Sequence, residues 1–85
     1  MVQIDADKLR KIRVVNKLTQ AEMGVICGVT ESMINKVERN AYPITDKINE
    51  AINREFQLDE RALSAVLTEY GRIVERKARL SLVGS

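Results

Sequence analysis

The chain has 85 residues, of which 45% are apolar and 31% charged, and its formal net charge is +2. A chain of this length supports one hydrophobic core, so we expect a single globular unit. It has no run of about 18 consecutive apolar residues, which a membrane span needs, and no basic segment followed by an apolar one near its start. We therefore expect a soluble, cytoplasmic protein.

The composition excludes several kinds of reactive site. There is one cysteine, Cys27, and no histidine, so an internal disulfide, the usual zinc ligand sets and a histidine-based catalytic triad are ruled out. The apolar residues around Cys27 are typical of the buried side of a helix. Asp5, Asp7, Asp59 and Glu60 stand where helices are expected to begin, and a negative charge there is favoured by the helix dipole. We therefore predict no enzyme activity, no cofactor and no metal site.

Apolar residues recur with a spacing near 3.6 along the whole chain, and no segment alternates strictly, so the sequence predicts an all-α fold. The first helix is expected to begin after Asp5 or Asp7 and to end near Asn16. Leu9 and Ile12 lie on its predicted buried face. A short connector then leads into the second helix.

The second and third helices are predicted to be separated by a very short turn. The second covers residues 20–27, with Thr19 as its N-cap, and Glu22 completes a capping box because it stands three residues later. Gly28 can end this helix because glycine adopts the left-handed conformation without a Cβ penalty. Thr30 can cap the third helix, which follows at once.

Two further helices complete the predicted fold. Thr45 and Asp46 open the fourth, whose apolar residues recur on one face. Asp59 caps the fifth, which is expected to extend to about Leu80. The expected architecture therefore has five helices, the last of them unusually long.

The segment from Leu18 to Asn40 resembles the helix-turn-helix of the Xre/Cro/CI repressor family. Counted from Gln20, the family pattern specifies a small residue, a glycine, an apolar residue, Ser or Thr, two further apolar residues and a glutamate. In this chain these positions are occupied, in that order, by Gly24, Gly28, Val29, Thr30, Ile34, Val37 and Glu38. The commoner residue at Gly24 is alanine, and we expect glycine there to cost the helix about 1 kcal/mol, which the capping box helps to offset. The resemblance covers roughly residues 8–67 and implies a compact five-helix lambda-repressor-like helix-turn-helix domain. The apolar pattern of the remaining residues adds an extended C-terminal helix to it.

In this family the third helix enters the major groove of double-stranded DNA. The resemblance therefore implies a sequence-specific transcriptional regulator, such as a repressor or a phage or mobile-element switch, that associates with the bacterial nucleoid when bound. With residues 30–39 as the recognition helix, the base-reading residues would be Thr30, Glu31, Ser32, Asn35 and Lys36. Hydrogen-bonding geometry suits Lys36 to guanine, Asn35 to adenine and Glu31 to cytosine. Each of them is also compatible with an ordinary solvated position on a helix.

Contacts to the DNA backbone and one internal ion pair also follow from the resemblance. The implied backbone contacts are Gln20, Arg39, Asn40 and Tyr42. Tyr42 could instead pack against Pro43. Arg13 stands seven residues before Gln20, where the family often has an arginine that pairs with the glutamate found here as Glu38. We therefore predict a partly buried, bidentate ion pair between Arg13 and Glu38.

The residues beyond the resemblance carry a second apolar pattern. Leu63 begins a series spaced like the seam of a coiled coil. We predict a helix-turn-helix domain over residues 1–67 and a dimerisation element over residues 68–85, with a homodimer interface formed by Val66, Tyr70, Ile73, Val74, Lys77 and Leu80. A twofold dimer would hold two recognition helices about one DNA turn apart, roughly 34 Å, and so would bind an inverted-repeat operator. Lys77 at a seam position weakens this prediction, and the tail could instead pack on the first helix or dock a different protein.

A second interpretation is a protein-interaction module such as an antitoxin, an anti-repressor partner or an adaptor. In that case the terminal helix would bind the partner and the helix-turn-helix would serve as a scaffold. The small net charge of +2 keeps this alternative open. Binding of single-stranded nucleic acid by stacking is disfavoured because the chain has only one Phe, two Tyr and no Trp. No small-molecule ligand is evident from the sequence.

Overall fold

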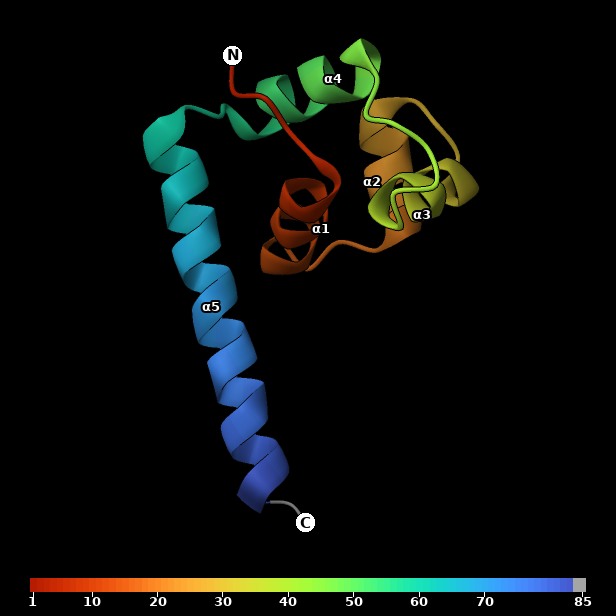
Figure 1. The fold of residues 1–85 in the computed structure, drawn as a ribbon. Helices are drawn as coiled ribbons and strands as arrows, with labels where there is room; N and C mark the ends of the chain where they lie inside the picture. Colours follow the sequence, from red (N-terminus) through yellow and green to blue (C-terminus); the bar gives the residue numbers. More distant parts are fainter. Residues whose placement is uncertain (84–85) are drawn as a thin grey trace.

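The computed structural model describes residues 1–83, which form five α-helices and no strand, so the predicted all-α fold is confirmed for this part of the chain. The helices are α1 (Ala6–Val15), α2 (Gln20–Cys27), α3 (Glu31–Glu38), α4 (Asp46–Phe56) and α5 (Glu60–Val83). The first four pack as a bundle, and α5 runs along one side and extends past it (Figure 1). No helix in residues 1–83 is long and apolar enough to cross a membrane.

The predicted N-terminal caps are all formed. The Thr19 hydroxyl accepts a hydrogen bond from the Glu22 amide at 3.0 Å, and the Glu22 carboxylate accepts one from the Thr19 amide at 2.9 Å. Thr30 caps α3 by accepting from the Met33 amide at 3.1 Å. The remaining caps are Asp5, Thr45 and Asp59. These bonds explain why helix starts were predictable, because each links residues only three apart.

The core lies among α1, α2, α3 and α4, and α5 adds little to it. The apolar side chains buried in this core include Leu9, Ile12, Met23, Cys27, Ile34, Val37, Ile48, Ala51 and Ile52. Among the α5 residues whose burial is described, 60–82, only Leu63 is buried, and Val66 packs partly buried against the cluster. The longest helix is therefore attached through its first half, and its second half leaves the core.

The segment before α1 is part of the core, which the sequence did not predict. Val2 and Ile4 are 8% and 2% exposed. Two buried asparagines of α4 satisfy the backbone of this segment: Asn53 Oδ1 accepts from the Val2 amide at 2.9 Å, and Asn49 Oδ1 accepts from the Ile4 amide at 2.8 Å. Asn53 Nδ2 also donates to the Val2 carbonyl at 2.8 Å. The extended segment thus obtains from two side chains the hydrogen bonds that a neighbouring strand would supply.

Gly24 allows α2 to pack against the turn that leads into α3. A Cβ at this position would lie 2.7 Å from the Val29 carbonyl oxygen and 3.2 Å from the Thr30 carbonyl carbon, both backbone atoms. Gly28, at φ 69°, ends α2 in the left-handed conformation, as expected. The interpretation of Gly24 as a departure that α2 merely tolerates is therefore wrong, because the close approach leaves no space for the methyl group of alanine.

We expect Gly24→Ala to lower the free energy of unfolding by about 1–3 kcal/mol, because overpacking outweighs the better helix propensity of alanine. Gly71 provides a matched control, since a Cβ added there would meet nothing within 4 Å. Gly71→Ala should raise stability by roughly 0.5–1 kcal/mol. Urea denaturation followed by circular dichroism measures both changes. Stabilisation by both variants would contradict the close approach at Gly24.

Candidate nucleic-acid interface

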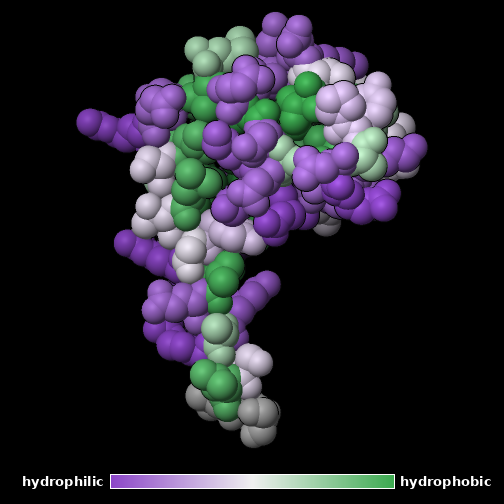
Figure 2. Space-filling model, in the orientation of Figure 1, coloured by the Kyte–Doolittle hydropathy of each residue, from purple (hydrophilic) through white to green (hydrophobic). Residues whose placement is uncertain are grey.

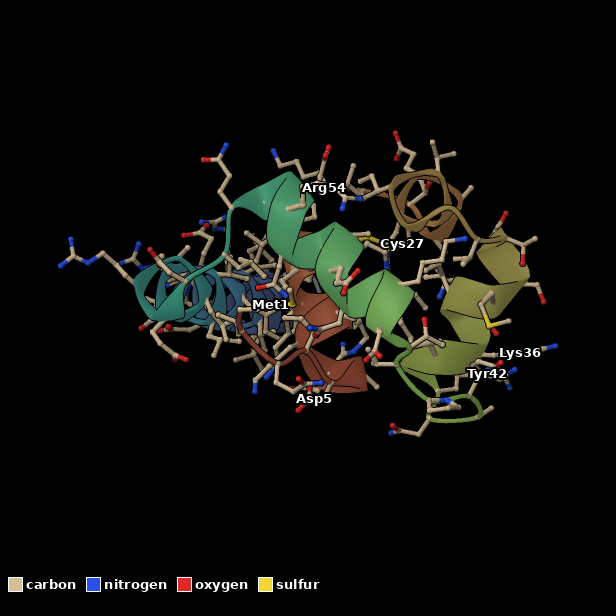
Figure 3. The ribbon with its side chains drawn as sticks, turned by 90° about the horizontal axis from the view of Figure 1, so that it is seen from above. Met1, Asp5, Cys27, Lys36, Tyr42 and Arg54 are labelled. Atoms are coloured by element: carbon tan, nitrogen blue, oxygen red, sulfur yellow. The ribbon has the colours of Figure 1, made fainter. Side chains whose placement is uncertain are left out.

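The outward side of α3 forms a polar surface. We call this the α3 surface; its exposed residues are Thr30, Glu31, Ser32, Lys36 and Arg39. Ile34 and Val37, both fully buried, hold the opposite side of α3 in the core. The helix lies on the side of the bundle away from α5 (Figures 1 and 3), so α5 as described, up to residue 83, does not cover this surface.

The residues after α3 extend the same side of the molecule. Arg39 is the C-cap of α3, and Asn40 adopts a positive φ of 60° that turns the chain. Tyr42 is 43% exposed, and Figure 3 shows it and Lys36 projecting at the same end of the molecule. The structure therefore groups the side chains of Lys36 and Tyr42, which sequence analysis assigned to base and backbone contacts respectively.

Most basic residues of α1 are engaged within the protein, unlike those of the α3 surface. Lys11 and Arg10 both pair with Asp7, at 2.8 and 3.1 Å. The hydrogen bond from Lys11 is the main reason that the pKa of Asp7 lies below its ordinary value. By contrast, Lys36 and Arg39 form no ion pair with any residue in the described part of the chain. Positive charge at the α3 surface is therefore available to an external anion.

Arg13 and Glu38 form the bidentate ion pair that was predicted. Arg13 Nε and Nη2 donate to the two carboxylate oxygens of Glu38 at 2.7 and 3.0 Å. Arg13 Nη1 also donates to the Leu18 carbonyl at 3.0 Å. The Glu38 side chain is 5% exposed and that of Arg13 18%. One guanidinium therefore ties α1 to the connector before α2 and to the end of α3.

Gln20 and Asn35 extend this network, which the sequence did not predict. Gln20 Nε2 lies 3.3 Å from Glu38 Oε1, and Asn35 Nδ2 lies 3.3 Å from Gln20 Oε1. Both residues are half-buried. The structure thus joins Gln20, which was expected to contact the DNA backbone, to Asn35, which was expected to contact a base edge. Their spacing of fifteen positions carries no local signal, so sequence reasoning could not have linked them.

The second half of α5 presents an apolar strip, but the first half is occupied within the protomer. Tyr70 Oη accepts a hydrogen bond from Arg10 at 2.9 Å, and Lys11 lies 5.3 Å from the centre of the Tyr70 ring. Val66 packs against the core. Val66 and Tyr70 are therefore half-buried within the protomer, and their expected part in a dimer interface stays a prediction. These contacts also show that the boundary expected between residues 67 and 68 falls inside one continuous helix whose packing reaches Tyr70.

Beyond Tyr70 the strip is open to solvent. Ile73 is half-buried, whereas Val74 and Leu80 are 48% and 62% exposed, and Lys77 is also exposed. Figure 2 shows apolar side chains on the projecting part of α5, with hydrophilic ones beside them. Of the six residues expected at the interface, three are exposed (Val74, Lys77 and Leu80) and three are half-buried (Val66, Tyr70 and Ile73).

A shallow depression of about 400 Å³ lies between α2 and α4. Cys27, which lines it, points from α2 toward α4 (Figure 3) and is 2% exposed, as expected for a buried helical residue. Burial raises the pKa of its thiol to about 11, so at neutral pH it is protonated and a poor nucleophile. Lys47 on the rim donates to the Gly28 carbonyl at 2.9 Å. Residues 1–83 contain no group of three side chains that could hold a metal ion.

No family model, curated protein or solved structure matches this chain. The function of the α3 surface must therefore be inferred from its own residues and contacts.

We expect Arg13→Ala to lower the free energy of unfolding by about 2–4 kcal/mol, because it leaves the buried Glu38 carboxylate without its cationic partner. The control is Arg72→Ala, which removes an exposed pair with Glu69 at 3.6 Å and should cost less than about 1 kcal/mol. Thermal denaturation compares the two. An unchanged melting temperature for Arg13→Ala would contradict a stabilising role for this pair.

Proposed function

We propose that this protein is a sequence-specific regulator of transcription that binds double-stranded DNA, with a lambda-repressor-like helix-turn-helix of the Xre/Cro/CI type. The observation that carries the proposal is the open α3 surface, held by a short turn after a capped α2 and left uncovered by the other helices of residues 1–83. The major groove, about 12 Å wide, accepts an α-helix, so α3 is of the right size to enter it.

In the proposed complex the contacts divide into two kinds. Thr30, Glu31, Ser32 and Lys36 face the base edges, where hydrogen bonds carry sequence information. Arg39, Asn40 and Tyr42 lie just after α3, and together with the amino end of α2 they contact phosphates on either side of the groove. The Arg13–Glu38 pair supports this arrangement because it holds α3 in one orientation before DNA arrives.

Binding of duplex DNA by the wild-type protein should weaken steeply with salt, with a slope of log affinity against log salt of about −0.9 for each phosphate neutralised. Arg39→Ala should weaken binding to all sequences and flatten this slope by about 1. Lys36→Ala should instead relax specificity at one base pair, by about 1–3 kcal/mol. Fluorescence anisotropy with sites selected from random duplexes measures both effects.

Arg54→Ala is the control for these variants, because Arg54 is exposed on α4 beside the α2–α4 depression and should leave binding unchanged. Indifference of the wild-type protein to duplex DNA at low salt would contradict the proposal. It would favour the alternative of a protein-interaction module, whose support is the apolar strip on α5.

We also propose that the regulator acts as a homodimer through the projecting half of α5. The support is the strip formed by Ile73, Val74, Lys77 and Leu80, which extends past the core; Ile73 is half-buried and the other three are exposed. A twofold axis through this strip would present two α3 surfaces to an inverted repeat, with half-sites near 10 bp apart, centre to centre.

The double variant Val74→Glu/Leu80→Glu should be monomeric in sedimentation equilibrium, because a dimer would place carboxylates in its apolar interface. It should also lose the preference for two half-sites over one. Arg79→Glu is the control, since residue 79 is about 100° around the helix from Leu80. A wild-type protein that is itself monomeric at the concentrations that bind DNA would contradict the dimer and assign the strip to a different protein.

A further inference from the structure

We propose that Gln20 is a positioning residue that fixes which edge of the Asn35 amide faces the DNA, and that Asn35 thereby selects adenine against guanine. This inference rests on the proposed DNA-binding function. It assigns to Gln20 a part in base recognition, in place of the phosphate contact expected from the sequence.

The Glu38 carboxylate determines which atoms of this network donate hydrogen bonds and which accept them. The Glu38 carboxylate, paired with Arg13, can only accept hydrogen bonds. The Gln20 atom that lies 3.3 Å from Glu38 Oε1 must therefore be the amide nitrogen. This leaves the Gln20 oxygen directed toward Asn35.

The same reasoning orients Asn35. Its Nδ2 lies 3.3 Å from the Gln20 oxygen, which also only accepts. A reversed Asn35 amide would bring two oxygens together, and reversing Gln20 as well would only move that conflict to Glu38. The ion pair of Arg13 with Glu38 thus determines, through Gln20, the direction of an amide on α3.

This direction leaves Asn35 Oδ1 without a donor among the described residues. No side-chain nitrogen or oxygen in residues 1–83 is both fully buried and without a partner. Asn35 Oδ1 therefore keeps some exposure to solvent, where an external donor can reach it. The second Nδ2 hydrogen remains beside it. Asn35 therefore offers an acceptor and a donor in a fixed order.

Adenine matches this pair of groups, whereas guanine does not. In the major groove adenine presents the N6 amino donor and the N7 acceptor, which an asparagine amide binds with both of its groups. Guanine presents two acceptors, N7 and O6, so its O6 would face the fixed Asn35 oxygen. Without Gln20 the amide could rotate and donate to guanine instead, and the discrimination would weaken.

The experiment measures the adenine-to-guanine preference at each operator position for three proteins. The wild type should show one position with a strong preference that Asn35→Ala abolishes. Gln20→Ala should reduce that preference about tenfold and leave the other positions unchanged. Gln20→Glu should retain it, because a carboxylate still accepts from Asn35, although repulsion from Glu38 should lower the melting temperature. A purely structural role of Gln20 would not separate base preference from stability in this way.

Several results would overturn the inference. If Gln20→Ala weakens binding equally for all sequences, Gln20 is a phosphate contact and not a positioning residue. If Asn35→Ala changes no base preference, Asn35 reads no base. A wild-type protein that binds duplex DNA with no preference at any position overturns the proposed function and this inference together, whereas preferences at other positions alone overturn only the inference.

If Gln20→Ala does not fold, Asn35→Asp serves as the second variant. It is nearly isosteric and only accepts hydrogen bonds, so the preference at that position should change from adenine to cytosine, whose N4 amino group donates. Retention of the adenine preference by Asn35→Asp would overturn the inference.

Discussion

The contact on which the orientation of α3 depends is the one between the Arg13 guanidinium and the Glu38 carboxylate. A carboxylate that is 5% exposed would be strongly destabilised if it were alone. Both of its oxygens are instead bound by one arginine, which also takes the Leu18 carbonyl as an acceptor. Parts of α1, the connector and α3 that are distant in the sequence are thereby joined at one point.

The two exposed surfaces of the molecule have different origins. The α3 surface is polar because Ile34 and Val37 are fully buried and Met33 packs partly buried against the core, and Gly24 allows the close packing that this requires. The apolar strip on α5 is exposed because the helix continues after its last anchor, Tyr70, has contacted α1. The first surface is suited to a charged, hydrated partner and the second to an apolar one. Their positions on opposite sides of the bundle allow both to be occupied at once.

Much of this architecture was predictable from the sequence. The start of α2 at Gln20 and its end before Gly28 follow from a capping box and a left-handed glycine, which act within four residues. The Arg13–Glu38 pair was also predictable, although only through the resemblance, because no local rule links positions 25 residues apart. The buried, unreactive character of Cys27 follows from its apolar neighbours.

The sequence by itself therefore determined the helices, their caps and the face that each helix buries, because these depend on periodicity and on bonds between near neighbours. Only the tertiary structure decided that Asn49 and Asn53 would bind the N-terminal segment, that Gln20 would reach Asn35, and where along α5 the apolar strip becomes exposed. The spacing along α5 is the same before and after Tyr70. The difference is whether α1 lies opposite that part of α5. This depends on how the two helices pack, because the pattern within either helix does not set the distance between them.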